Sequence, residues 1–256
     1  MPATREGYNR SDVYDAIYTK MKSYHEEAGR VVTILRQFMP GRSYADMTLL
    51  DVACGTGLHL QWFAQWFKSV EGVDLSTEQL AAAERRLPNV PLYEGNMLSL
   101  MLADVATDLE APEPTFDVVT CLFSAIGHMQ DVQQLRRSIH AMADHLNPGG
   151  VLLVEPWLTR DSWTPGHISI DVVDDPNFKV SRITRSTLDG RLTTLEMHHT
   201  VGTPDGIEYY IEEHRVALFT QEEYEEAFRR AGLEVTFDPK GISKNGRGIY
   251  IGVKPS

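Results

Sequence analysis

A short apolar run that passes through two glycines into a helical pattern is the feature of this sequence that most constrains its fold. Residues 48–53 read TLLDVA, and Gly55 and Gly57 follow directly after them. The run predicts a buried strand. A helix is predicted next, because apolar residues recur at helical spacing at Leu60, Phe63, Ala64 and Phe67. A strand that turns over glycines into a helix is the repeating unit of an α/β protein with a parallel sheet.

The same alternation of strand and helix signals continues along most of the chain. Apolar runs predict further strands at residues 70–74, 90–93, 116–121, 151–154, 233–237 and 248–253. A first helix is predicted over residues 11–38, with Ser11 as its N-cap. Two more helices are predicted to begin after the capping pairs Ser76 with Gln79 and Thr220 with Glu223. Another helix is predicted to end at the stop sequence NPGG, residues 147–150. We therefore expect an α/β fold with a seven-stranded, mostly parallel, doubly wound (Rossmann-like) sheet.

Residues 157–218 break this alternation. Three or four strand-like stretches lie between residues 168 and 218, and Asp189-Gly190 and Asp205-Gly206 are sequences of hairpin turns. We expect an antiparallel β insert that lies over the ligand-binding edge of the sheet. The expected domains are a cofactor-binding domain of residues 1–156 and 219–256 and a substrate-side insert of residues 157–218.

Composition narrows the classes of partner. The chain has 24 Lys and Arg residues against 36 Asp and Glu residues, a net charge of −12, whereas nucleic-acid binding depends on a basic face. No apolar run approaches the roughly 20 residues that span a bilayer, and the first residues lack the apolar stretch of a secretory signal. Cys54 and Cys121 are too few for a disulfide framework, and no His/Cys group has zinc-site spacing. We expect a cytoplasmic protein that binds no metal, nucleic acid or membrane.

The glycine turn limits the choice of small-molecule ligand. In an open α/β sheet, ligands bind at the carboxyl ends of the strands, where this turn lies. A phosphate-binding loop needs Lys and Ser or Thr after its last glycine, but Leu58 and His59 stand there. A dinucleotide turn has a third glycine where this chain has Leu60, which disfavours a nicotinamide or flavin cofactor but leaves it open.

Residues after the next two strands suit a nucleoside. Asp74 ends the second strand of the sheet, where a carboxylate can accept hydrogen bonds from both hydroxyls of a ribose. Asn96 and Met97 follow the third strand, where the amide and a neighbouring backbone group can bind an adenine. Phe123 and Ser124 follow the fourth strand. This ordered set indicates a nucleoside-containing cofactor.

The set resembles the class I S-adenosylmethionine-dependent methyltransferases over residues 48–156 and 220–253. The first motif of that class, an acid followed by three spaced glycines, matches Asp51, Ala53, Gly55 and Gly57, with Ala53 in place of the first glycine. The acid that this class places near the adenine is Asn96 here. The resemblance implies S-adenosyl-L-methionine as cofactor, bound by Tyr14, Tyr18, Asp51, Ala53, Gly55, Gly57, Asp74, Leu75, Asn96, Met97 and Phe123.

A narrower resemblance covers nearly the whole chain. The stretches SDVYDAIY, LFSAIGHM, NPGGVLLVEPW, HISIDVV and GRGIYIGV are similar to the TDP-3-amino-sugar N-methyltransferases of macrolide biosynthesis. This likeness implies a nucleotide-sugar substrate, antibiotic biosynthesis and a homodimer. The stretch at residues 98–115 is longer and more acidic than is usual there.

Methyl transfer to an amine asks the protein mainly for alignment. His128 follows the fourth strand and is the candidate catalytic base, and Tyr14 is the second candidate catalytic residue. Arg182 and Arg247 are the expected partners of a substrate pyrophosphate, with Arg185 a weaker candidate, since arginine binds phosphates in bidentate fashion. Trp157 is placed to stack on a thymine ring or to pack beneath a lid.

Three other functions remain open at this point. The chain could methylate another small amine, an amino acid or a phenol. It could bind S-adenosylmethionine without catalysis, as a regulator or partner protein. A nicotinamide oxidoreductase is the most distant possibility.

Overall fold

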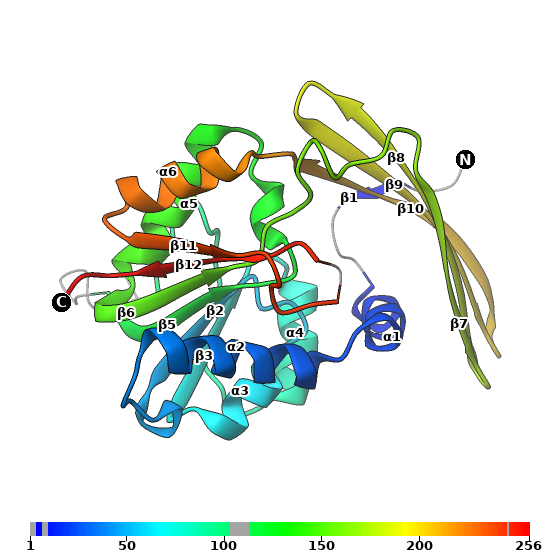
Figure 1. Cartoon of the computed structure of the whole chain (residues 1–256). Coiled ribbons are helices and arrows are strands. Elements are labelled where there is room, and N and C mark those ends of the chain that lie inside the picture. The colour runs from blue at the N-terminus through cyan, green and yellow to red at the C-terminus, as the bar shows by residue number, and fades with distance from the viewer. Residues whose placement is uncertain (1–3, 7–9, 103–112, 245) are drawn as a thin grey trace.

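Two β-sheets organise the protein in a computed structural model, which describes all residues except 1–3, 7–9, 103–112 and 245 (Figure 1). The larger sheet has seven strands in the order β11-β12-β6-β5-β2-β3-β4. All its neighbouring pairs are parallel except those of β12, which is antiparallel to both β6 and β11. The strands are β2 (Thr48–Val52), β3 (Ser69–Asp74), β4 (Leu92–Glu94), β5 (Phe116–Cys121), β6 (Leu146–Val154), β11 (Glu234–Asp238) and β12 (Ile249–Val253). The predicted fold class is confirmed.

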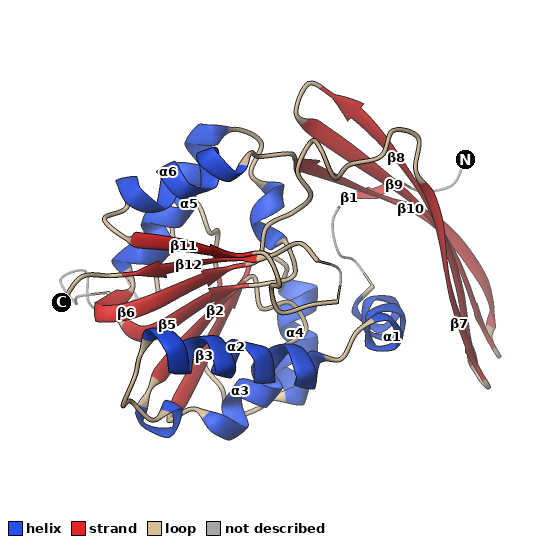
Figure 2. Cartoon of the chain, in the orientation of Figure 1, coloured by secondary structure: helices blue, strands red, loops and turns tan. Residues whose placement is uncertain are grey.

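Helices cover both faces of this sheet, as Figure 2 shows. One face carries α2 (Tyr24–Phe38) and α3 (Leu60–Trp66), and the other carries α5 (Val132–Asp144) and α6 (Gln221–Arg230). Helix α4 (Thr77–Arg86) connects β3 to β4, and short 3-10 turns occupy η1 (Tyr44–Asp46) and η2 (Ala125–His128). The capping pair Thr220 and Glu223 forms as predicted, with both reciprocal bonds present.

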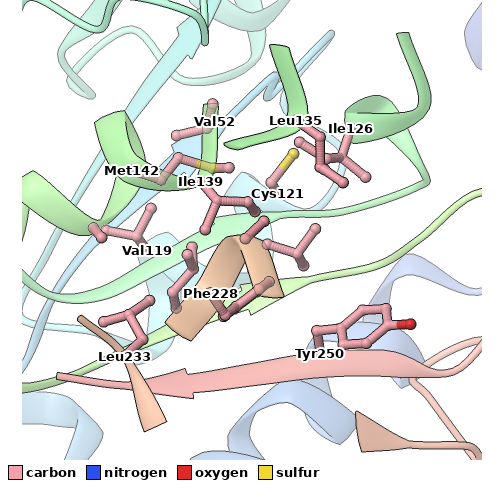
Figure 3. Close-up of a cluster of buried hydrophobic side chains, with 14 of the residues drawn as sticks. Val52, Val119, Cys121, Ile126, Leu135, Ile139, Met142, Phe228, Leu233 and Tyr250 are labelled. Carbon is pink, nitrogen blue, oxygen red and sulfur yellow. The ribbon is translucent and has the colours of Figure 1, made fainter. Parts of the chain in front are cut away.

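Side chains of α5, α6 and the sheet strands interlock in one of the two hydrophobic layers (Figure 3). Ile139 and Met142 of α5 and Phe228 of α6 are completely buried against Val119 of β5. Burial of each such side chain stabilises the fold by about 1.5–3 kcal/mol. The layer therefore holds α5 and α6 against the sheet.

The second sheet contains four long antiparallel strands and one short parallel one. Its order is β1-β10-β9-β8-β7, with β7 (Ile168–Asp175), β8 (Phe178–Asp189), β9 (Leu192–Thr203) and β10 (Gly206–Ala217) joined by hairpins. The two predicted turn sequences lie at the β8–β9 and β9–β10 hairpins. Strand β1 (Thr4–Glu6), which the sequence pattern does not predict, pairs in parallel with β10.

Two predicted elements differ from the structure. Residues 11–38 form two helices, α1 (Ser11–Met21) and α2, because Lys22 adopts an extended backbone and Ser23 caps α2 by accepting a hydrogen bond from the Glu26 N–H. Ser11 is the first residue of α1, and Arg10 occupies the N-cap position. The NPGG stretch lies inside β6, which starts at Leu146 rather than Val151.

Helix α1 lies between the two sheets (Figure 1). Its apolar residues Val13 and Ile17 are buried against Val173, Val180 and Tyr210 of the second sheet. The segment that starts the chain thus packs on the predicted insert, and the division of the chain into two domains stays a prediction. Within the described part of the chain, no helix has the length and apolar character needed to cross a membrane.

Candidate active site

A cavity of about 780 Å³ opens at the carboxyl ends of the parallel strands and is bounded on its other side by β10. This size and position are typical of small-molecule sites in open α/β sheets. The structure brings together on its lining nine of the residues singled out in the sequence: Tyr14, Ala53, Gly55, Asp74, Leu75, Asn96, Met97, Phe123 and His128.

The turn after β2 takes a left-handed backbone at three positions. Ala53, Gly55 and Gly57 have φ angles of 59°, 56° and 76°. A residue with a Cβ pays about 1–2 kcal/mol for that conformation, which Ala53 tolerates and the glycines avoid. A Cβ at Gly57 would also lie 3.2 Å from Leu87 Cδ1. The turn is therefore sharp enough to bring its backbone next to the cavity.

Asp74 fastens this turn from the end of β3. Its carboxylate accepts hydrogen bonds from the N–H groups of Gly55 and Ser76, both at 2.8 Å. Burial raises the pKa of Asp74, and the two backbone hydrogen bonds act against that rise. The same carboxylate lines the cavity, so it can bind ligand hydroxyls there.

Asp51 lies behind the turn rather than on the large cavity. Its side chain is 3% exposed and accepts a hydrogen bond from Thr120 Oγ1 at 2.7 Å. Burial, together with the nearby charge of Asp74, raises the pKa of Asp51 to about 7. Asp51 lines a small adjoining pocket with Tyr14, Ala53 and Gly55, whereas Gly57 lines neither pocket.

Three aromatic rings meet between α1 and the end of β5. The rings of Tyr14 and Tyr18 lie 4.5 Å apart, and that of Phe123 lies 4.9 Å from Tyr18. Lys22 Nζ sits 3.7 Å from the centre of the Phe123 ring. Tyr14 and Phe123 line the cavity, while Tyr18 lines a separate small pocket with Arg182.

The turn after β5 is held in an unusual conformation. Phe123 and Ser124 have φ angles of 51° and 61°, which few residues other than glycine adopt. The buried Glu155 accepts a hydrogen bond from the Phe123 N–H at 2.7 Å, and Ser124 Oγ donates to the Pro156 carbonyl at 2.6 Å. Strain that neighbouring groups maintain in this way is common at functional sites.

His128 lies at the end of η2 and faces the cavity. Burial, with a smaller contribution from His214, lowers the pKa of His128 to about 4, and a hydrogen bond with the backbone of Arg215 acts in the opposite direction. The imidazole is therefore neutral near neutral pH. A base of such low pKa takes a proton from an alkylammonium ion unfavourably, so the buried setting of His128 favours orientation of a ligand over proton removal.

The two predicted phosphate-binding arginines lie in different surroundings. Arg182 is 6% exposed, donates to Asp171 Oδ2 at 2.8 and 2.9 Å, and donates to the Tyr18 hydroxyl at 2.9 Å. Arg247 donates to Ser124 Oγ at 2.8 Å, and its guanidinium lies 4.6 Å from the Trp157 ring centre. Neither arginine, nor Trp157, is part of the lining of the large cavity. The weaker candidate, Arg185, pairs with Glu196 at 3.5 Å.

Sequence reasoning missed part of the lining. Glu213, His214 and Arg215 of β10 and Glu78 of α4 face the cavity. Alternation along β10 puts His214 on the same face as the buried Tyr210 and Val216, and Glu213 and Arg215 on the other face, so alternation could not have identified these lining residues. Pairing between distant segments decides which cavity each face meets. Within the described residues, no group of acidic, histidine and cysteine side chains could hold a metal ion.

The fold and site together define a class of protein. A seven-stranded sheet with one antiparallel strand near its edge, a glycine turn after β2 and an acid at the end of β3 are the features of class I S-adenosylmethionine-dependent methyltransferases. Residues 49–150 match the family model of a methyltransferase domain.

Comparisons with known proteins refine that class. A dTDP-3-amino-3,6-dideoxy-alpha-D-glucopyranose N,N-dimethyltransferase of Streptomyces fradiae is 39% identical over 245 residues, which cover 95% of this chain and 90% of the relative. The crystal structure of Streptomyces venezuelae DesVI matches with a TM-score of 0.86 and 35% identity, over 98% of this chain and 100% of DesVI. SAM-bound CalS10, an amino pentose methyltransferase from Micromonospora echinaspora involved in calicheamicin biosynthesis, matches with a TM-score of 0.81 and 37% identity, over 98% of this chain and 100% of that one.

The chain belongs to the family of S-adenosylmethionine-dependent amino-sugar N-methyltransferases. It is an enzyme, and its cofactor is S-adenosyl-L-methionine.

Proposed function

We propose that this enzyme transfers the methyl group of S-adenosylmethionine to the amino group of a TDP-linked amino sugar. The observation that carries the proposal is the likeness to a TDP-amino-sugar N,N-dimethyltransferase over 95% of the chain, substrate-side segments included. CalS10 acts on an amino pentose, so the family accepts more than one sugar. The proposed substrate is therefore defined by its nucleotide and its amino group, and the identity of its sugar is not specified.

The cavity residues fit the cofactor. Asp74 would offer its carboxylate oxygens to the ribose hydroxyls. Asn96 and Met97 lie where we propose that the adenine binds, and Leu75, which follows Asp74 directly, lines the same cavity. The left-handed turn at Ala53–Gly57 and the buried Asp51 behind it would hold the amino-acid end, with Tyr14, Tyr18 and Phe123 above. When bound, the cofactor supplies an electrophilic methyl group.

The side chains around the methyl position serve mainly to align the acceptor. An amine attacks through its lone pair, and the sulfur takes the electrons of the broken bond, so no protein group forms a covalent bond. His128 and Tyr14, which both line the cavity, would hydrogen-bond the amine in its neutral form. The proton released on methylation would pass to solvent, because His128, with its pKa of about 4, is a poor acceptor.

We propose that residues 157–218 form the substrate-side domain and that residues 1–156 and 219–256 form the cofactor domain. The nucleotide end of the substrate would lie near residues 157–218. Arg247 would bind the pyrophosphate after leaving Ser124 Oγ, and Trp157 would contact the thymine. A role for Arg182 would require it to exchange Asp171 for phosphate oxygens.

The product of the reaction tests this function. The enzyme is incubated with S-adenosylmethionine and a TDP-linked 3-amino sugar, and NMR locates the added methyl. We expect methylation of the nitrogen that depends on both components. Methylation of a sugar hydroxyl instead, or an unchanged amino sugar, would refute the proposal.

One observation favours a second acceptor class, a small amine without phosphates. Arg182 is already paired with Asp171, and Arg247 with Ser124, so both guanidinium groups have protein partners before any phosphate arrives. If free amino sugars or other amines were turned over as efficiently as the TDP-linked sugar, this second class would be the correct one.

We also propose that the enzyme works in the cytoplasm, where nucleotide sugars and S-adenosylmethionine are made.

We further propose that the enzyme is a homodimer whose subunits contact each other through the outer face of the second sheet. Four apolar side chains on β7 and β8, Ile168, Ile170, Val172 and Ile183, are 46–65% exposed, and Ile170 pairs with Ile183 across the strands. An apolar patch of this kind commonly marks a protein interface. We expect light scattering to give a dimer for the wild type and a monomer for Ile170→Glu. A wild-type monomer would refute this assembly.

A further inference from the structure

A glutamate bridges two buried histidines beside the cavity. Glu212 and His214 lie two residues apart on the inner face of β10, and His199 faces them from β9. Glu212 Oε1 is 3.5 Å from His214 Nε2, and Glu212 Oε2 is 3.3 Å from His199 Nε2. His199 and His214 are 2% and 5% exposed. A carboxylate in this position restricts how both imidazole rings can turn.

One of these histidines reaches the candidate active site. The ring of His214 lies 5.7 Å from the ring of His128 at an interplanar angle of 63°, and both residues line the cavity. The Gln130 side chain fastens the same region, because its Nε2 donates to the carbonyls of His128 at 2.7 Å and Arg215 at 3.2 Å. The Gln130 side chain thus links turn η2, which ends at His128, to strand β10.

The bridging glutamate is ionised near neutral pH. Burial acts to raise its pKa, but the contacts with His199 and His214 outweigh burial and lower the pKa of Glu212 to about 2. The other titratable groups of the small pocket that Glu212 lines with His199 and His214 are Arg10, Tyr14, Tyr18, Arg182 and Tyr210. A largely buried negative charge therefore lies next to His214, whose ring also lies near the ring of His128.

We propose that Glu212 is a positioning residue, which acts through His214 to hold the His128 ring in one orientation beside the acceptor amine. The inference rests on the proposed function, since it places the amine next to His128. A ring already held in place can hydrogen-bond the amine without first being ordered, which is how alignment contributes to rate. Glu212 itself touches neither the amine nor the cofactor in this account.

Glu212→Gln tests the proposal because it keeps the size of the side chain and removes its charge. We expect kcat to fall by about 5- to 30-fold, the effect of weakening one contact in a connected network. The KM of the TDP-amino sugar and the Kd of S-adenosylmethionine should stay within about twofold. Glu196→Gln is the matched control, because Glu196 makes the same kind of pair with His198 at 3.0 Å on β9 and lies outside the linings of the cavity and the small pocket, so its kcat should stay within about twofold.

A double-mutant cycle separates positioning from a merely structural role. In a His128→Gln background the Glu212→Gln change should cause no further loss of kcat, because the residue through which Glu212 acts is gone. Equal losses in both backgrounds would overturn the proposal. If Glu212→Gln fails to give a wild-type circular dichroism spectrum, His214→Asn replaces it in the cycle. We then expect His214→Asn to lower kcat in the wild-type background and to cause no further loss in the His128→Gln background.

The failure of this inference is distinguishable from failure of the proposed function. A wild-type enzyme that leaves the amino sugar unmethylated refutes the function. A wild-type enzyme that methylates it, together with a Glu212→Gln variant of wild-type kcat, refutes only the positioning role.

Discussion

At the scale of single residues, Asp74 is the side chain whose role the sequence indicated most directly. An acid at the end of the second parallel strand can bind a ribose, and the structure shows it on the cavity, where it also holds the glycine turn through two backbone N–H groups. The partners themselves could not be predicted, because they depend on how tightly the glycine turn closes.

Asp74→Asn should weaken S-adenosylmethionine binding by about 1–3 kcal/mol, since it removes the charge from the hydrogen bonds to the ribose. Calorimetric titration measures this. Glu94→Gln is the matched control, because Glu94 pairs in register with Asp74 on β4 but is exposed and outside the cavity lining. Equal affinity of Asp74→Asn and wild type would remove Asp74 from the site.

Asp51 gives a prediction about stability and pH. Its pKa of about 7 is above the ordinary value, so the folded state binds a proton that the unfolded chain has already lost. The stability that this proton supplies is complete below about pH 4 and is lost as the pH rises through about 7. Asp51→Asn should therefore gain stability relative to wild type as the pH rises from about 4 to about 7, as measured by urea unfolding. Parallel stability curves for the two proteins would show that Asp51 has an ordinary pKa.

At the scale of elements, helix α1 is the clearest case of tertiary contacts overriding the sequence pattern. The helical pattern runs unbroken through residues 11–38, yet Lys22 is extended. Its ammonium is buried, paired with Glu27 at 2.7 Å and placed over the Phe123 ring. No local signal announces such contacts, whereas the caps of α4 and α6 involve neighbouring residues and were predictable.

One residue of α1, Asp15, ties the helix to the glycine turn. Asp15 accepts a hydrogen bond from Thr56 Oγ1 at 2.6 Å and pairs with Arg86 Nη2 at 2.5 Å. Asp15→Asn should speed cofactor release and cost about 1 kcal/mol of affinity, because it loosens a helix that covers the turn. Stopped-flow displacement measures the release rate.

Lys20→Ala provides the control for this change. Lys20 also lies on α1, but it pairs with Asp175 of β7 at the exposed side. We expect its release rate to match that of the wild type, since exposed ion pairs contribute little. Equal effects of the two substitutions would mean that α1 acts as a whole and that the Asp15 contacts are not specific.

At the scale of the whole molecule, the cavity belongs to both sheets. The parallel sheet and its ligand edge could be predicted because each unit is read from a local run of residues, and Asp51–Gly57, Asp74, Asn96 and His128 follow from that edge. Antiparallel strands over this edge were expected as well, but the residues of theirs that face the cavity could not be predicted, because they depend on how the hairpin sheet packs over the first one and on β1 joining it. Residues 98–115, singled out for their length and acidity, lie partly outside the described residues.

One ratio tests whether the enzyme recognises the nucleotide part of a nucleotide-linked amino sugar. The value of kcat/KM is measured for a TDP-linked amino sugar and for the methyl glycoside of the same amino sugar, in the wild type and in Arg247→Ala. Truncating a charged partner costs about 2–5 kcal/mol when it is buried, and half-buried Arg247 belongs at the lower end. We predict that the wild type strongly prefers the TDP-linked sugar and that Arg247→Ala loses at least about tenfold of that preference with unchanged cofactor affinity. A wild type that uses both substrates equally well would contradict the account.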